Sequence, residues 1–190
     1  MPRLCPLVAG VGQASAERPQ ERQGFWLGIG GGYGSADASC DECDGGDRQG
    51  SGAGYVKLGW TLNDRVLLGG EFNLWTKEQD VVTVNFYNAS GTLTFYPQGA
   101  SGFFLKGGVG ASFVDTEVVD GGTRITADLG SGLGLVAGVG YDLRVARIIS
   151  ITPAVNFLYG QPGDLVVAGE TLARNWKQNV VDFTVGITFH

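Results

Sequence analysis

The sequence predicts an all-β fold, a closed antiparallel barrel of eight strands that follow one another up and down around its wall. Apolar residues recur at every second position along most of the 190-residue chain, whereas the spacing typical of a helix is almost absent. The 33 glycines lie inside the apolar stretches and prolines number only 6, so the glycine content does not indicate a linker or a disordered chain. The connections alternate in length, which is typical of an up-and-down meander.

Eight stretches carry the alternating pattern, and each is predicted to be one strand. They are 24–35, 51–62, 65–76, 81–96, 102–115, 132–144, 148–159 and 177–189. The connections are tight at 63–64 and 145–147, short at 97–101, intermediate at 77–80, and long at 36–50, 116–131 and 160–176. Tight turns should therefore gather at one end of the barrel and longer loops at the other.

The first three strands each show one apolar face and one face of small or polar residues. The apolar face carries Phe25, Leu27, Ile29, Tyr33, Val56, Leu58, Trp60, Val66, Leu68, Phe72 and Leu74. The opposite face carries Trp26, Gly28, Gly30, Gly32, Tyr55, Lys57, Gly59, Thr61, Gly69, Glu71 and Asn73. Because strand side chains alternate between faces, these lists predict three regular strands that share one apolar surface.

The fourth strand changes parity along its length. Its apolar positions are Tyr87, Leu93 and Phe95 in the register of the shared apolar face, and Val82, Val84 and Phe86 in the other register. A bulge near 85–88 would return the chain to one register, and so we expect either a bulge there or an upper end that leaves the apolar surface.

The last four strands continue the pattern of the first three. Their apolar face includes Phe103, Leu105, Val109, Phe113, Leu133, Leu135, Val139, Tyr141, Leu143, Ile149, Ile151, Val155, Phe157 and Tyr159, and it ends with the alternating residues from Val181 to Phe189. Their other face includes Phe104, Lys106, Gly108, Gly110, Ser112, Gly134, Gly138, Gly140, Asp142, Thr152, Ala154, Asn156, Asp182, Thr184, Gly186 and Thr188.

The composition of the second face indicates which side of the sheet points inward. A face in contact with bulk water should be crowded with Lys, Glu and other long charged side chains, and this face is not. Small residues with single charges of both signs fit the narrow interior of a small closed barrel. The apolar face must then contact a solvent other than water, and we predict a transmembrane β-barrel whose outer surface contacts lipid.

Charge and hydropathy exclude several other classes. The net charge is -6, and the absence of a basic patch argues against nucleic acid as a partner. No stretch approaches the ~18 consecutive apolar residues of a transmembrane helix.

The first 23 residues resemble an export signal followed by a spacer. Arg3 precedes a short apolar stretch, and Ala14-Ser15-Ala16 matches the small-residue rule for cleavage, so cleavage is expected near residue 16. An ordinary disordered leader is the alternative. The barrel domain is then predicted to be 24–190.

Taken together, these stretches resemble the small eight-stranded outer-membrane β-barrels of the OmpA/OmpX-like class. The resemblance rests on GFWLGIGGGYG in the first strand, on FFLKGGVGASF and LGLVAGVGYDL, and on the final strand FTVGITF. It implies a Gram-negative outer membrane, outer-membrane lipid and the barrel-assembly machinery as partners, termini on the periplasmic side and long loops outside. In this family an aromatic residue ends the last strand as an insertion signal, a role that falls to Phe189, although His190 follows it here.

Cys40 and Cys43 form the most distinctive local motif. A C-x-x-C pair can hold zinc or exchange electrons, but structural zinc needs four ligands and the only other cysteine is Cys5. A disulfide within the first long loop is the favoured prediction for an exported chain, with a metal site or free thiols as alternatives. Acidic residues of the loop could hold Ca²⁺ weakly, but they lack the spacing of a calcium-binding loop: Asp37, Asp41, Glu42, Asp44 and Asp47.

Charged residues of the inward face are predicted to form an ion-pair network in the lumen. They are Lys57, Glu71, Lys106, Asp142, Arg144 and Asp182. Such a network could gate a narrow pore, but eight strands enclose only enough room for side chains, so a charge-balanced plug is favoured.

The sequence predicts no enzyme, no cofactor and no resident metal. A Ser-His-acid hydrolase needs an oriented histidine, and the only histidine is His190. We therefore expect a structural or surface-interaction role with acidic outer loops and an unknown surface ligand. A small transport pore and a soluble, lipocalin-like ligand-binding barrel are the alternatives.

Overall fold

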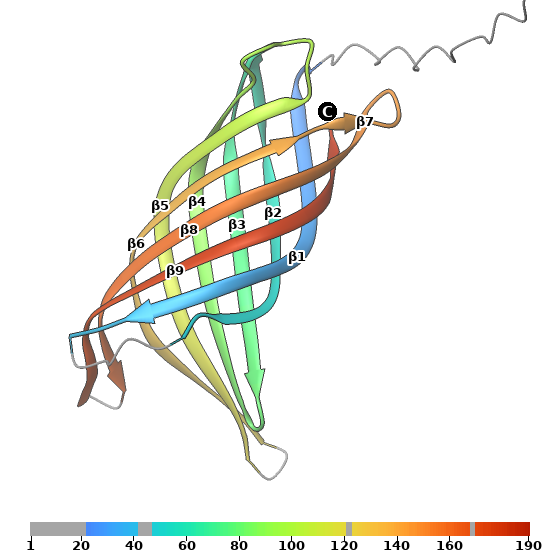
Figure 1. The fold of residues 1–190 in the computed structure, drawn as a ribbon. Helices are drawn as coiled ribbons and strands as arrows, with labels where there is room; N and C mark the ends of the chain where they lie inside the picture. The colour runs from blue at the N-terminus through green and yellow to red at the C-terminus, as the bar shows by residue number, and fades with distance from the viewer. Residues whose placement is uncertain (1–21, 42–46, 121–122, 168–169) are drawn as a thin grey trace, which may run out of the picture.

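The protein folds as a closed antiparallel β-barrel (Figure 1). The computed structural model describes residues 22–41, 47–120, 123–167 and 170–190. Its strands are β1 (Phe25–Ser39), β2 (Gln49–Asn63), β3 (Val66–Gln79), β4 (Val82–Phe95), β5 (Phe103–Asp120), β6 (Thr123–Tyr141), β7 (Leu143–Arg144), β8 (Ile149–Val167) and β9 (Glu170–Phe189). In the described part of the chain, no helix is long and apolar enough to cross a bilayer.

The wall has eight positions, because the two-residue strand β7 continues the path of β6. Neighbouring strands pair in sequence order from β1 to β6, β6 pairs with β8, and β8 pairs with β9. The pairing of β9 with β1 closes the ring, from Leu27 opposite Phe189 to Ser39 opposite Lys177. A membrane-spanning sheet must have no unpaired edge, and closure of the ring meets this requirement. The closed ring confirms the predicted eight-stranded, up-and-down barrel.

The two ends of the barrel differ in their connections. One end, here the turn end, carries the turns at 64–65, 96–102 and 145–148 together with the start of β1 and the end of β9. The other end, here the loop end, carries the 40–48 connection and the two-residue turn Asp80-Val81. Asp80 adopts a φ of 52°, a left-handed conformation that fits a tight turn. At the loop end, β6 begins at Thr123, well beyond Leu133, where its pairing with β8 begins (Figure 1).

Two predicted connections at the loop end prove to be mostly strand. The sequence pattern predicted loops at 116–131 and 160–176, but β5 extends to Asp120 and β8 to Val167, and their partners begin at Thr123 and Glu170. Apolar residues do not alternate regularly there, but backbone pairing continues between β5 and β6 and between β8 and β9. The intermediate connection predicted at 77–80 is likewise shorter, because β3 continues to Gln79.

The bulge, one of the two explanations offered for the fourth strand, is absent. The pairing of β4 with β3 and with β5 runs without a register shift. Tyr87 points outward, and Phe86 is buried inside the barrel. The apolar residues change parity because the loop end of the lumen is filled by apolar side chains such as Phe86, while the backbone of β4 stays regular.

Candidate functional site: the lumen and its loop-end mouth

Apolar side chains cover the outer surface of the barrel. Leu58, Phe72, Val155 and Phe183 are 48%, 45%, 45% and 55% exposed, although each would be a core residue in a water-soluble fold. Their immediate sequence neighbours point to the other face and are buried, namely Lys57, Glu71, Asn156 and Asp182. This confirms the predicted inversion, in which the apolar face points outward.

Aromatic rings border this outer surface at both ends. Phe25, Trp60, Phe95 and Phe103 are exposed near the turn end. Tyr33, which is 64% exposed, faces outward eight positions along β1 from Phe25. With a rise of about 3.3 Å per residue and a strand tilt of about 40°, this spacing gives an apolar belt roughly 20 Å tall.

Large inward side chains pack against glycines of neighbouring strands. A Cβ atom placed on Gly30 would lie 2.6 Å from Cε1 of Tyr55, and one placed on Gly69 would lie 2.6 Å from Cζ2 of Trp26. At Gly140, a Cβ atom would lie 2.5 Å from Cζ of Phe104. The predicted small face is thus a set of spaces that aromatic rings fill, which is how a narrow barrel reaches protein-like packing.

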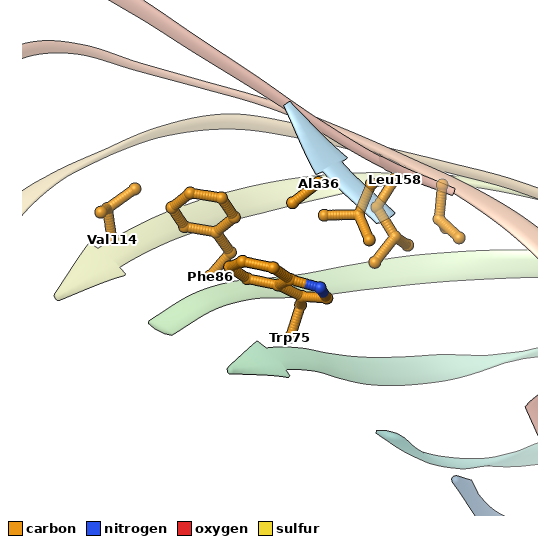
Figure 2. Packing of buried hydrophobic residues seen from close by; sticks show 7 residues of the cluster. Ala36, Trp75, Phe86, Val114 and Leu158 are labelled. Carbon is orange, nitrogen blue, oxygen red and sulfur yellow. The ribbon is translucent and has the colours of Figure 1, made fainter. Parts of the chain in front are cut away.

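Two apolar clusters occupy the lumen. The loop-end cluster consists of Ala36, Trp75, Phe86, Val114, Val136, Leu158 and Val180, and Figure 2 shows Trp75 and Phe86 lying against each other in it. The turn-end cluster consists of Trp26, Leu67, Tyr96, Phe104 and Ala154. Both clusters narrow the interior.

A polar layer contains three of the predicted lumen charges, Lys57, Glu71 and Lys106. Nζ of Lys106 lies 2.5 Å from Oε1 of Glu71, and both side chains are almost fully buried. The ammonium group of Lys57 lies 5.3 Å from the ring centre of Tyr55 and 5.4 Å from that of Phe104, within range of a cation–π interaction. The structure therefore pairs Lys106 with Glu71 and places Lys57 over aromatic rings.

The remaining acidic residues of the predicted network are held by neutral donors. Nδ2 of Asn156 donates to Oδ1 of Asp182 at 2.7 Å. Asp142 lies at the turn end, where it accepts hydrogen bonds of 2.7 Å from the hydroxyl groups of Tyr96 and Thr152. Arg144 also lies at the turn end, and its Nη1 donates to the carbonyl of Arg147 at 3.0 Å. Lys57, Glu71 and Lys106 thus lie in one layer, whereas Asp142 and Arg144 lie at the turn end.

Arg22 closes the turn end with a stacked guanidinium group. Its Cζ lies 3.5 Å from the ring centre of Tyr96, and its Nη1 and Nη2 donate to the carbonyls of Gly99 and Ser101 at 3.0 and 2.9 Å. Arg22 is only 1% exposed. The residues before the barrel therefore contribute to its interior, and the sequence pattern gave no sign of this.

Asp142 and His190 lie side by side at the turn end, outside the membrane-spanning strands. Nε2 of His190 lies 3.5 Å from Oδ2 of Asp142. Burial lowers the pKa of His190 below its ordinary value of 6.5, and the carboxylate of Asp142 offsets this only in part. Burial would raise the pKa of Asp142, but contact with His190, the charge of Lys57 and the Tyr96 hydroxyl together hold it well below its ordinary value.

Cys40 and Phe189 lie at opposite ends of the barrel. Cys40 follows β1 at the loop end and is disulfide-bonded. Cys43 and Cys5 lie outside the described residues, so the pairing of Cys40 with Cys43 stays a prediction, as does the export signal in residues 1–16. Phe189 ends β9, where it is 38% exposed and pairs with Leu27 and Ile149.

A cavity of about 340 Å³ opens at the loop end above the loop-end cluster. Its apolar wall is formed by Ala36, Trp75, Val84 and Phe86, and its polar lining includes Asp37, Asp47 and Lys77. Sequence analysis missed Trp75 and Phe86 as lining residues, although both lie on the inward parity of their strands. No group of three or more potential metal ligands occurs within the described ranges.

A closed eight-stranded barrel with an apolar belt outside and a packed polar layer inside defines the class of small outer-membrane β-barrel proteins. No protein-family model matches the chain, and no curated protein matches it in sequence. Its structural neighbours are outer-membrane barrels of the OmpA/OmpX-like fold.

Two solved structures illustrate the likeness. Neisserial surface protein A (NspA) aligns with a TM-score of 0.58 and 17% identity, over 90% of this chain and 99% of that one. Ail, the attachment invasion locus protein of Yersinia pestis, was solved in complex with the heparin analogue sucrose octasulfate. It aligns with a TM-score of 0.55 and 14% identity, over 87% of this chain and 99% of that one. At such identities the likeness concerns the fold alone.

Proposed function

We propose that this protein is a structural, surface-contact component of the outer membrane whose lumen is plugged by its own side chains. The observation that carries the proposal is the filling of the lumen at successive levels. The stacked rings of Trp75 and Phe86 lie near the loop end, the Lys106–Glu71 ion pair lies between the clusters, and Arg22 closes the turn end. An eight-stranded barrel filled in this way has little room for a water column.

Conductance across a planar lipid bilayer tests the plug. The full chain, refolded and inserted, is expected to give no discrete current steps, while a porin measured in the same bilayer shows that channels would be detected. Insertion is checked separately by the changed gel migration of the unheated protein. Reproducible current steps from correctly folded protein would contradict the plug and favour the transport pore.

The soluble, lipocalin-like alternative conflicts with the structure. A lipocalin needs the apolar face of its sheet inside, around a ligand, whereas here Leu58 and Phe183 face outward and Lys57 and Asp182 face inward. The protein should accordingly remain monodisperse only in the presence of detergent or lipid.

We further propose that the loop end faces the outside of the cell and contacts molecules there. Carboxylates outnumber basic groups among its described residues: Asp37, Asp41, Asp47, Glu78, Asp80, Asp115, Glu117 and Asp164 against Arg48, Lys77, Arg174 and Lys177. A polyanion such as the heparin analogue held by Ail would be repelled by this charge, so we favour neutral or cationic partners.

During biogenesis, Phe189 is proposed to be recognised by the assembly machinery. Its exposed ring at the end of β9 supports this role. Phe189→Ala should reduce the amount of folded barrel in outer-membrane fractions more than Phe183→Ala does, and equal yields of the two variants would argue against the role.

A further inference from the structure

The cavity at the loop end has the size and lining of a small-molecule site. Its volume of about 340 Å³ falls within the range of ligand pockets, which combine an apolar wall with a few polar groups. Here the wall is aromatic, formed by Trp75 and Phe86, and the carboxylates of Asp37 and Asp47 lie among its polar lining.

The aromatic wall is held rigidly. The rings of Trp75 and Phe86 stack with their centres 5.0 Å apart and their planes 23° apart. Nε1 of Trp75 donates to the carbonyl of Gly34 at 3.1 Å, and a Cβ atom on Gly34 would lie only 3.0 Å from Cδ1 of this indole. Trp75 and Phe86 are only 3% and 7% exposed, so a ligand would contact a small part of this wall, which is already in place and reduces the entropy cost of binding.

The charges at the rim are not equally available to a ligand. Nζ of Lys77 donates to the carbonyl of Gly50 at 3.2 Å, and the guanidinium of Arg48 donates to the Ser35 carbonyl and to Oδ1 of Asn179. Asp37 accepts one long bond of 3.4 Å from the Asn179 amide, and Asp47 is exposed. The cations are thus bound to protein oxygens, whereas the carboxylates can still accept a ligand's hydrogen bonds.

We propose that this cavity binds a small organic ammonium compound with a ring or short hydrocarbon end. The apolar end would lie against Trp75 and Phe86, and the ammonium group would contact the carboxylates of Asp47 and Asp37. The two carboxylates then favour a cation by charge pairing, and the aromatic surface favours the apolar end of the ligand.

Three probes that share one ring and differ in head group test the proposal. The full chain in detergent micelles is titrated with 2-phenylethylamine, 2-phenylethanol and 3-phenylpropionate, and the NMR shift of the Trp75 indole N–H is followed. The amine is expected to saturate at the lowest concentration and the carboxylate at the highest. The neutral alcohol shows how much the ring and the micelle contribute without charge.

Matched variants at the rim separate charge pairing from general apolar binding. Asp47→Asn should weaken amine binding about three- to fivefold, and adding Asp37→Asn should weaken it about tenfold. Lys77→Gln, which removes a positive charge from the same lining, should strengthen amine binding. Each variant must retain the indole shift of the unmodified protein without ligand.

Three results would overturn the proposal. One is the absence of saturable binding for every probe. Another is tighter binding of 3-phenylpropionate that is lost in Lys77→Gln, because it would assign the cavity to anions. The third is amine binding that stays unchanged in the Asp37→Asn, Asp47→Asn double variant, because it would show ring or micelle association without recognition of the charge.

Discussion

The Lys106 ammonium group forms an ion pair with the carboxylate of Glu71 inside the lumen. Its contact with Glu71 is 2.5 Å long, with side chains only 4% and 0% exposed. Glu71→Ala would leave a buried cation without this partner, and we expect the free energy of unfolding to fall by about 3 kcal/mol. Urea titration of the barrel in lipid vesicles, followed by tryptophan fluorescence, measures the loss.

Glu78→Ala provides the matched control for Glu71→Ala. Glu78 lies on the same strand, β3, but is exposed at the loop end, so its removal should change the free energy of unfolding by less than about 0.5 kcal/mol. Equal effects of the two substitutions would mean that the buried pair contributes nothing specific.

The burial of His190 predicts a loss of stability on mild acidification, which the contact with Asp142 offsets only in part. Because burial places the pKa of His190 below 6.5 in the folded state, the unfolded chain binds the proton more readily. The free energy of unfolding should thus be constant above pH 7 and fall as the pH drops through 6.5. The lowered pKa of Asp142 adds a further loss only as the pH falls below its ordinary value of 3.8.

His190→Gln should remove the dependence between pH 7 and pH 5. Unfolding free energies at several pH values, measured for both proteins in the same vesicles, provide the comparison. A slope that persists in the variant would assign the titration to another group.

For single residues of the lumen, the sequence could predict which face of the strand each side chain lies on, but not which side chains it contacts. Parity along the strands placed Lys57, Glu71 and Lys106 inside, because strand geometry fixes the face of each side chain. Which of these groups pair depends on the register and tilt of strands that are distant in sequence. For this reason the pairing of Glu71 with Lys106, and the stacking of Arg22 on Tyr96, could not be deduced beforehand.

At the scale of the strand, glycines decide how closely inward rings can approach the wall. We expect Gly30→Ala to lower the free energy of unfolding by about 1–3 kcal/mol, because the new methyl group would overlap the ring of Tyr55 at 2.6 Å. Gly107→Ala is the control, since a Cβ atom there meets nothing within 4 Å on the lipid-facing side of β5. Urea unfolding of both variants provides the comparison, and an equal loss in the two would point to backbone effects of replacing glycine.

The strands themselves could be predicted where one face contacts lipid. Where β5, β6, β8 and β9 continue past the belt, apolar and polar residues no longer alternate regularly in the sequence, so the pattern does not show that the strands continue. In β4 the pattern was misleading in a different way. Phe86 is apolar but points into the lumen, so its position in the alternation suggested a bulge that the strand does not contain. Alternation of apolar residues therefore predicted which parts of a strand lie within the belt better than it predicted the full length of the strand.

At the scale of the whole molecule, the outer belt sets where the protein can reside. Val109 faces outward near the middle of β5 and is 59% exposed. Val109→Arg should lower the free energy of unfolding in vesicles by about 2–4 kcal/mol, because the charge would lie at the centre of the bilayer. Val81→Arg, in the exposed Asp80-Val81 turn beyond the belt, should have almost no effect. Similar losses at both positions would mean that the belt is not immersed in lipid.

The height of the apolar belt, measured from Phe25 to Tyr33, also affects which membranes suit the protein. A hydrocarbon layer of average thickness, about 30 Å, would have to thin by roughly 10 Å to match the span from Phe25 to Tyr33, and each ångström of such mismatch costs a fraction of a kcal/mol. We therefore expect the barrel to be less stable in thick, sterol-rich or highly ordered membranes than in thin ones. The height of its apolar belt thus favours a thin host bilayer.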